Sequence, residues 1–473
     1  MTRHRPPPAR GGHGKSTQTQ AAGLFTEALA HHRAGRLDQA EALYRRFLAL
    51  VPGHRGGTAN LAGVLAAGGR PEPAVALYRA LAEESDDAHA HYNLATALMR
   101  CDRWDQAEPA FRRTLALDPA HVPGLVNLAF FGARFGQLEA AETLGRRALR
   151  LQPEHREAHG NLAMVLLRAG RLAEGWREYE WRDGLTRLPG PAWRGEEVAG
   201  KVVLLYAEQG LGDSLQFMRY APLVAARGAR VVLRVQRPLI RLAASLVRLP
   251  GAGAITVVAD DQPPPPHDLA CPLMSLPGLF ATDLATIPAE IPYLWPDAGE
   301  AEEWRRRLAG PPGLLVGLAW AGDPRPDNPR AAAIDRRRSL RLADFAPLAA
   351  VPGVSLVSLQ KGAPAEQLRT PPPGLAVRDV MGEIGDFAGT AALAAGLDLV
   401  IAVDTSVAHL AGALGKPVWV LSRHDGCWRW LLERDDSPWY PTLRLYRQTR
   451  PGAWAEVIAR VAADLAGLVA LGR

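Results

Sequence analysis

A chain of 473 residues is too long for one ordinary domain, so two or three domains are expected. Hydrophobic residues make up 48% and charged residues 22% of the chain, a balance that excludes a largely disordered protein. The formal charge of +6 does not indicate nucleic acid as a partner, because residues 1–20 supply most of it through Arg3, Arg5, Arg10 and Lys15.

The start of the chain predicts a disordered basic tail over residues 1–20, because this segment is rich in Pro, Gly and polar residues. It carries no apolar run of the kind that forms a secretory signal, and no stretch reaches the roughly 18 apolar residues that span a bilayer. Cys101, Cys271 and Cys427 lie far apart without a CxxC motif, so neither a disulfide framework nor a zinc site is indicated. We therefore expect a cytoplasmic location and no transmembrane segment.

Residues 21–181 contain an internal repeat. The triplet Asn-Leu-Ala recurs at spacings of 33, 34 and 34 residues. An alanine recurs with nearly the same period, and the residue four positions after it is Tyr, Tyr, Phe and Gly in successive repeats. Small residues where helices cross and Gly or Pro at helix ends predict two short helices in each unit. The pattern resembles the tetratricopeptide repeat, with about five units. The last unit has Gly175, Trp176, Tyr179 and Trp181, which predicts a cap that docks onto the segment that follows.

One asparagine in each repeat is a candidate acceptor-binding residue. A side-chain amide has both donors and an acceptor, so it complements a peptide unit. In the similar arms of protein O-glycosyltransferases, such asparagines hold an extended acceptor polypeptide, which implies an acceptor protein or peptide as partner. The alternative, left open, is that each one caps or bridges neighbouring helices. These residues are Asn60, Asn93, Asn127 and Asn161.

Residues 182–200 are expected to be a linker, and the pattern changes after it. Short β-branched runs alternate with helical stretches, which predicts βαβ units in two lobes with parallel sheets, over 201–297 and 312–470. The fold class is therefore α plus α/β, a helical-repeat solenoid followed by two Rossmann-like lobes. Ligands bind at the carboxyl ends of the strands in such sheets. The predicted strands are 201–206, 231–235, 254–259, 268–273, 314–320, 354–359, 399–403 and 417–421, and a final helix is expected over 454–468.

The first motif, Glu208 to Ser214, follows the first predicted strand directly. Gly210 and Gly212 let the backbone approach a ligand. Asp213, at the edge of the expected cleft, is a candidate general base for an acceptor hydroxyl. Its alternative role is the N-cap of the next helix, and the two roles are compatible.

The second motif, residues 403–417, predicts a strand, a tight turn, a helix and another strand. The amides of Thr405, Ser406 and Val407 would open the helix and face an anion, so a diphosphate fits there. His409 is a candidate donor to a phosphate oxygen, although a lone histidine on a helix more often has a structural partner. Asp404 suits a sugar hydroxyl or the amides of the turn, since its charge repels phosphate.

Basic residues of the second lobe are further donor-binding candidates. Arg336, Arg337 and Arg338, expected just before a helix, would neutralise a leaving diphosphate, and Lys361 adds a cation after the next strand. The alternative for the arginines is a solvated surface run. Four aromatic residues are expected to be core rather than cleft wall: Trp428, Trp430, Trp439 and Tyr440.

The two motifs together resemble the heptosyltransferase-type glycosyltransferases, which have the GT-B fold, across roughly residues 200–470. The resemblance implies that Asp213 is the base, that residues 404–409 bind the sugar and diphosphate of a nucleotide-sugar donor, and that a basic residue near Arg337 or Arg338 assists. The family commonly has glycine where Ser406 stands. No Asp-x-Asp triplet is present, so no metal and no cofactor are expected.

These features predict an inverting, metal-independent glycosyltransferase, whose acceptor is a protein hydroxyl recruited by the repeat arm. A similar order, repeats before a transferase domain, occurs in protein O-glycosyltransferases. Three alternatives stay open: a non-catalytic scaffold with a degenerate domain, a lipopolysaccharide-type heptosyltransferase and a nucleotide-sugar epimerase.

Overall fold

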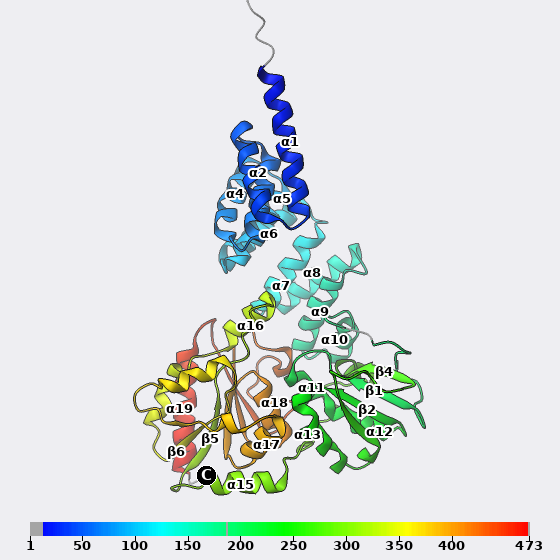
Figure 1. Cartoon of the computed structure of the whole chain (residues 1–473), viewed down its shortest axis with the longest axis vertical. Helices are drawn as coiled ribbons and strands as arrows, with labels where there is room; N and C mark the ends of the chain where they lie inside the picture. Colours follow the sequence, from blue (N-terminus) through cyan, green and yellow to red (C-terminus); the bar gives the residue numbers. More distant parts are fainter. Residues whose placement is uncertain (1–12, 186–187, 472–473) are drawn as a thin grey trace, which may run out of the picture. The chain divides into compact units, whose positions relative to one another are not determined.

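The computed structural model of the chain describes residues 13–185 and 188–471 (Figure 1). The chain divides into two compact units, residues 1–158 and 159–473, called below the N-terminal and the C-terminal unit. The N-terminal unit is helical, whereas the C-terminal unit contains two parallel sheets with helices around them. This agrees with the predicted fold class.

Helices follow one another through the N-terminal unit, and each packs against the next. The repeated alanines Ala40, Ala74, Ala107 and Ala141 are at most 1% exposed, because the two helices of a repeat cross at these positions. The predicted helical solenoid is thus confirmed. Its helices are α1 His13–Arg33, α2 Leu37–Leu50, α3 Arg55–Ala67, α4 Pro71–Glu84, α5 Ala88–Arg100, α6 Trp104–Leu117, α7 Val122–Arg134 and α8 Leu138–Leu151.

The first helix begins inside the segment predicted to be a disordered tail. Because α1 begins at His13, the prediction of a disordered segment over residues 1–20 is wrong for residues 13–20. Residues 1–12 lie outside the described part of the chain.

The turn inside each repeat requires a left-handed backbone. Gly35, Gly69 and Gly136 have φ of 71°, 76° and 81°, which glycine adopts at little cost. The repeat without a glycine uses Asp102 at φ 55° instead, and aspartate is among the few other residues that tolerate this conformation.

Histidine side chains cap the first helix of three repeats, at His54, His121 and His155, which sequence reasoning missed. His54 Nδ1 accepts a hydrogen bond from Gly57 N, and His121 Nδ1 accepts one from Gly124 N, both at 3.0 Å. Asp87 occupies the same position before α5. A neutral imidazole can accept these bonds, whereas a protonated one cannot.

We expect the N-terminal unit to lose stability in acid through His121. Burial, and then the neighbouring His89, lower the pKa of His121, so its contribution is complete above about pH 6.5 and declines as the pH falls. Between about pH 7.5 and pH 5.5, wild type should lose about 1 kcal/mol more unfolding free energy than His121→Asn, which keeps the cap without titrating. Urea unfolding followed by circular dichroism measures this difference. Equal losses in both proteins would contradict it.

The last helix pair, α9 Arg156–Arg168 and α10 Leu172–Tyr179, belongs mostly to the C-terminal unit. Trp176 Nε1 donates to Thr282 O at 2.9 Å, and Trp176 and Tyr179 lie in the main core of that unit. The predicted docking of this cap is therefore confirmed. A side chain at Gly175 would place its Cβ 2.6 Å from Leu167 Cδ2, so glycine allows the two helices to cross closely.

The first lobe has a four-stranded parallel sheet in the order β3-β2-β1-β4. Its strands are β1 Val202–Tyr206, β2 Arg230–Val235, β3 Ile255–Ala259 and β4 Leu269–Pro272, as the β-branched runs predicted. Its helices are α11 Leu211–Phe217, α12 Ala221–Ala225, α13 Ile240–Ala243 and α14 Leu276–Leu279.

The second lobe has a six-stranded parallel sheet in the order β10-β9-β8-β5-β6-β7. Its strands are β5 Leu314–Ala319, β6 Val354–Ser358, β7 Val377–Arg378, β8 Leu399–Val403, β9 Val418–Ser422 and β10 Leu443–Arg447. Its helices, with α15 before it, are α15 Ala298–Leu308, α16 Pro329–Arg338, α17 Phe387–Ala395, α18 Ser406–Ala413 and α19 Trp454–Ala470. The prediction omitted β7 and β10, which form the two edges.

The segment predicted as a linker, residues 182–200, packs partly against the first lobe. Trp193 is 3% exposed, and its backbone N donates to Ala270 O of β4 at 2.9 Å. Thr186 and Arg187 lie outside the described residues.

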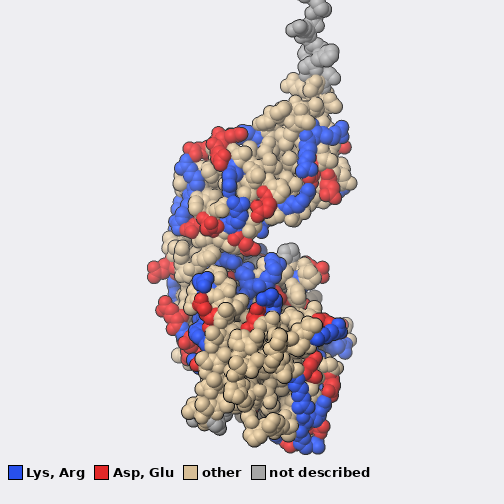
Figure 2. Space-filling model, turned by 90° about the vertical axis from the view of Figure 1, so that its left-hand side faces the viewer, with Lys and Arg blue, Asp and Glu red and all other residues tan. Residues whose placement is uncertain are grey.

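The four aromatic residues expected in the core, Trp428, Trp430, Trp439 and Tyr440, are at most 5% exposed, which confirms that prediction. On the face that Figure 2 shows, basic and acidic side chains are interspersed. No described helix has the length and apolar character to cross a membrane.

Candidate functional site

The two sequence motifs meet between the lobes. The loop after β1 leads into α11, and the turn after β8 leads into α18, and these two helices pack directly on each other. At their contact, a Cβ on Gly212 would lie 2.9 Å from His409 Cδ2 and 3.4 Å from Ser406 Cα. Gly212 therefore acts by close helix packing, which brings the start of α11 against α18.

We expect Gly212→Ala to destabilise the C-terminal unit by about 1–3 kcal/mol, because the new methyl group meets a ring that its neighbours hold in place. Urea unfolding measures the change. Gly253→Ala is the matched control, since a Cβ there meets nothing within 4 Å. A Gly212→Ala protein as stable as the control would show that the two helices separate easily.

Asp213 makes two contacts through its carboxylate. The N-cap residue of α11 is Gly210, so the N-cap prediction for Asp213 is wrong in position. Asp213 is the third residue of the helix, and its Oδ2 accepts a hydrogen bond from Gly210 N at 2.9 Å, as in a capping box. Oδ1 forms an ion pair with Arg429 of the second lobe, and the Asp213 side chain is 22% exposed. The structure thus supports a capping role, while the base role stays a prediction.

The start of α18 leaves a hydroxyl for a ligand. Thr405 is the N-cap residue but makes no side-chain capping bond, and its buried Oγ1 finds no hydrogen-bond partner among the described residues. A buried hydroxyl without a partner is costly unless a ligand or water completes it. This fits a ligand oxygen at Thr405, next to the first amides of the helix.

The arginine run is itself helical, which the prediction did not include. It ends α16, and the 3-10 helix Leu342–Ala350 follows it, so the run does precede a helix as expected. Arg338 Nη1 donates to Asp404 O at 3.0 Å, which places it at the turn before α18, and Arg338 also pairs with Asp335. Arg337 pairs with Asp425 at 3.3 Å, in the loop after β9. Both arginines thus contact the carboxyl edge of the second sheet rather than forming a solvated run.

His409 is buried and uncharged. Its Nδ1 lies 3.0 Å from Tyr440 Oη, and its ring stacks on Trp430 at 5.5 Å. Burial, and then the nearby Arg429, lower the pKa of His409 to about 3. These contacts support the structural interpretation, and a ligand phosphate would meet a neutral imidazole there.

Lys361, which follows β6, contacts a loop of the second lobe. Its Nζ donates to Ile384 O, in the loop before α17. Ile384 lines a cavity of about 660 Å³ together with residues such as Arg241, Trp304 and Asp386, but no predicted site residue lines that cavity. Lys361 has no hydrogen bond or ion pair with Asp213 or Thr405 among the described residues, and donor binding by Lys361 stays a prediction.

Several buried polar residues escaped sequence reasoning. Gln360 accepts from Trp320 N and Ala321 N at 3.0 and 2.9 Å and so holds the end of β5. Arg219 donates to Pro288 O and Trp439 O, which ties the first lobe to the second. Contacts between residues so far apart in the sequence leave no local pattern that could predict them. Glu208, which forms an ion pair with Arg182, could be found only because it begins the first motif.

The repeat asparagines divide between the units. In the N-terminal unit, Asn127 Nδ2 donates to Tyr92 Oη at 3.1 Å, which is the bridging role, and Asn60 and Asn93 are half-buried. In the C-terminal unit, Asn161 is 8% exposed and its Nδ2 has no hydrogen-bond partner among the described residues. Acceptor binding by these side chains stays a prediction.

Comparisons with known protein families match both units. Residues 353–421 match glycosyltransferase family 9 (heptosyltransferase). Residues 25–90 match the tetratricopeptide repeat, and residues 59–177 match the middle tetratricopeptide-like domain of cilia and flagella-associated protein 70.

The chain is also similar to individual proteins and solved structures. The protein FlbA of Caulobacter vibrioides is 29% identical over 333 residues, which cover 63% of this chain and 53% of FlbA, so the chain spans about half the length of this relative. Among solved structures, MamA from Desulfovibrio magneticus RS-1 is 17% identical and matches 34% of this chain and 91% of its own, with a TM-score of 0.32. The pilF protein of Pseudomonas aeruginosa is 19% identical and matches 45% and 87%, with a TM-score of 0.35.

Proposed function

Because this chain carries tetratricopeptide repeats followed by a glycosyltransferase family 9 (heptosyltransferase) domain, we propose that it transfers a sugar from a nucleotide-activated donor to a protein hydroxyl. The transfer is inverting and metal-independent, the second lobe holds the donor in a GT-B arrangement, and the repeats recruit the acceptor. The observation that supports the proposal is the close packing of Gly212 against α18, because the motif that contains Asp213 then lies against the helix whose start is the expected diphosphate site.

In the proposed mechanism the acceptor oxygen attacks C1 of the sugar as its proton passes to Asp213. The new C1–O bond forms on the face opposite the breaking bond to the diphosphate, so the anomeric configuration inverts. The nucleoside diphosphate leaves with both electrons of that bond. The amides of residues 405–407 and the guanidinium of Arg338 stabilise its negative charge. Arg337, which now pairs with Asp425, is a second cation for this charge.

Asp213 can take the proton while it keeps both present contacts, because each carboxylate oxygen has two lone pairs, and Gly210 N uses one on Oδ2 and Arg429 one on Oδ1. An acceptor hydroxyl that approaches either oxygen would donate to a remaining lone pair. In this mechanism Asp404 binds a sugar hydroxyl, and Thr405 Oγ1 forms a hydrogen bond with an oxygen of the donor. His409 forms a hydrogen bond with a phosphate oxygen as a neutral imidazole.

The proposal is tested by incubating the purified full chain with a panel of nucleotide sugars labelled in the sugar, with and without extract of the source cells. Release of nucleoside diphosphate that depends on the extract, with label in the protein fraction, supports it. Label in the lipid fraction supports a lipopolysaccharide-type acceptor instead. Conversion of the donor into its epimer supports an epimerase, and an unchanged donor supports a scaffold.

The same assay in the presence of a chelator tests whether transfer is independent of metal. We expect transfer in excess EDTA to stay within about twofold of the untreated rate, because the charge of the leaving group meets amides and arginines of the chain. Loss of transfer that added Mg²⁺ or Mn²⁺ restores would contradict this part of the proposal.

A further inference from the structure

A short segment of the second lobe, residues 427–430, contacts three parts of the C-terminal unit at once. It follows β9 and includes a short 3-10 helix, Trp428–Trp430. Its three consecutive side chains point to the last repeat helix, to the predicted base and to the histidine of α18. Its two tryptophans are among the residues that the sequence predicts to be core, and the proposed function uses Arg429 only as a contact of Asp213.

Trp428 binds the segment to the last repeat. Its ring meets Trp176 edge-on, with centroids 5.2 Å apart, and lies 6.3 Å from Tyr179, both in α10. Trp176 is itself fixed, since its Nε1 donates to Thr282 O. Trp428 is 5% exposed, so the last repeat helix and this segment form one packed layer.

Arg429 holds the predicted base. Its guanidinium pairs with Asp213 Oδ1 and donates through Nε to Gln216 Oε1, both in α11 of the first lobe. Its Nη1 contacts Cys427 Sγ at 3.2 Å, and its charge lies 4.5 Å from the centroid of the Trp428 ring. Only 7% of Arg429 is exposed, so its neighbours fix its orientation.

Trp430 completes the segment on the donor side. It is fully buried and stacks on His409 of α18, the helix whose start is the expected diphosphate site. The position of Arg429 is thus determined on one side by the last repeat helix and on the other by α18.

We propose that Arg429 is the positioning residue for Asp213, and that the last repeat helix sets its position through Trp428. The inference rests on the proposed function, since it takes Asp213 as the base. It makes the last repeat pair part of the transferase site, in addition to any role of the repeats in binding acceptor.

A double-mutant cycle tests the first half. We expect Arg429→Gln to lower kcat about 100-fold and to leave KM for the donor within about twofold, with partial rescue by Arg429→Lys. If Arg429 acts through Asp213, the double variant Asp213→Asn/Arg429→Gln has the same kcat as Asp213→Asn alone. Arg434→Gln is the matched control, because this nearby arginine pairs with the exposed Asp436 and should keep kcat unchanged. If the loss of kcat in the double variant equals the product of the losses in the two single variants, the inference is overturned, because the two residues then act independently.

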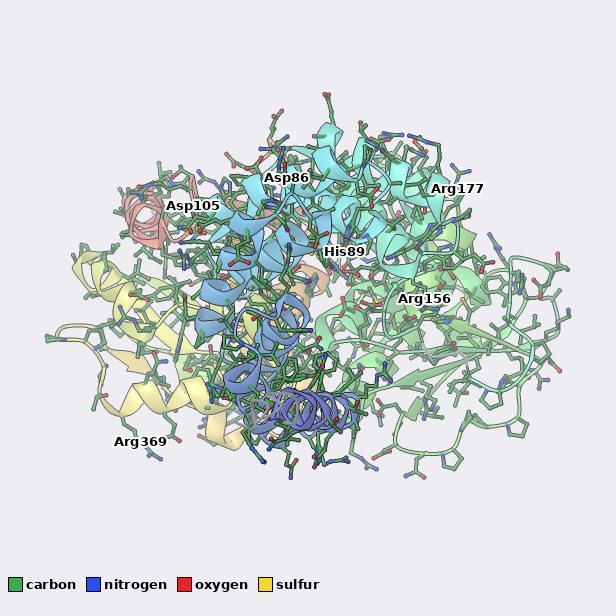
Figure 3. The ribbon with its side chains drawn as sticks, turned by 90° about the horizontal axis from the view of Figure 1, so that it is seen from above. Asp86, His89, Asp105, Arg156, Arg177 and Arg369 are labelled. Atoms are coloured by element: carbon green, nitrogen blue, oxygen red, sulfur yellow. The ribbon has the colours of Figure 1, made fainter. Side chains whose placement is uncertain are left out.

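A second pair of variants tests the repeat helix. Trp176→Leu should lower kcat about tenfold without raising KM for the acceptor, and Trp176→Phe should recover most of the loss. Arg177→Ala, on the exposed face of the same helix (Figure 3), should behave as wild type. A change in acceptor KM alone, or no change in kcat, overturns the coupling.

The two proposals fail differently. A wild-type chain that transfers no sugar, or an Asp213→Asn chain as active as wild type, overturns the proposed function and the inference with it. An inactive Asp213→Asn chain beside a fully active Arg429→Gln chain overturns only the inference.

Discussion

Replacing Asp213 with asparagine should reduce sugar transfer about 10³-fold, because the chain then lacks the group that takes the acceptor proton. Donor binding should change by less than about twofold, since the amides and Arg338 that face the diphosphate remain. Asparagine still accepts the hydrogen bond from Gly210 N, so α11 keeps its cap. Single-turnover rates and the thermal shift produced by nucleoside diphosphates measure the two quantities.

The second lobe offers a matched control for this variant. Asp344 also caps a helix, accepting from Arg341 N at 2.8 Å, and it also pairs with an arginine. Its side chain is 29% exposed, against 22% for Asp213. Asp344→Asn should therefore show the cost of losing a capping carboxylate without any loss of transfer. An Asp213→Asn chain that matches this control in activity would reduce Asp213 to a helix cap.

Arg182→Met should destabilise the C-terminal unit by about 3–5 kcal/mol, the largest effect on stability that we expect. Arg182 and Glu208 form an ion pair at 2.6 Å in which the side chains are 4% and 1% exposed. Without the arginine, a carboxylate remains buried and uncompensated, next to the loop that carries Gly210 and Gly212. Urea unfolding measures the loss, and transfer should fall with it as that loop shifts.

Two further variants identify the cause. Arg182→Met/Glu208→Leu should recover at least half of the lost stability, because it removes the unpaired charge as well. Arg305→Met breaks a pair whose side chains are 58% and 55% exposed, so it should cost less than about 0.5 kcal/mol. Equal costs for Arg182→Met and Arg305→Met would show that water reaches Glu208.

The amino-acid sequence by itself determined the parts of this protein that local periodicity encodes. The 33- and 34-residue repeat specified paired helices, because each unit must bury the same small and aromatic positions against its neighbours. The central strands β1, β5 and β8 were predictable from their unbroken apolar runs, since both faces of a parallel sheet are covered. The edges β7 and β10 were not, because β7 is two residues long and β10 alternates with arginines.

The tertiary structure alone decided which polar groups meet. Asp213 and Arg429 are 216 positions apart, and nothing near either one marks the other as a partner. The same holds for Arg338 with the turn at Asp404, and for Trp428 with Trp176. A sequence records the local preferences of a helix or strand, whereas an ion pair between lobes depends on how whole elements pack. The residues that complete the candidate site therefore became visible only in three dimensions.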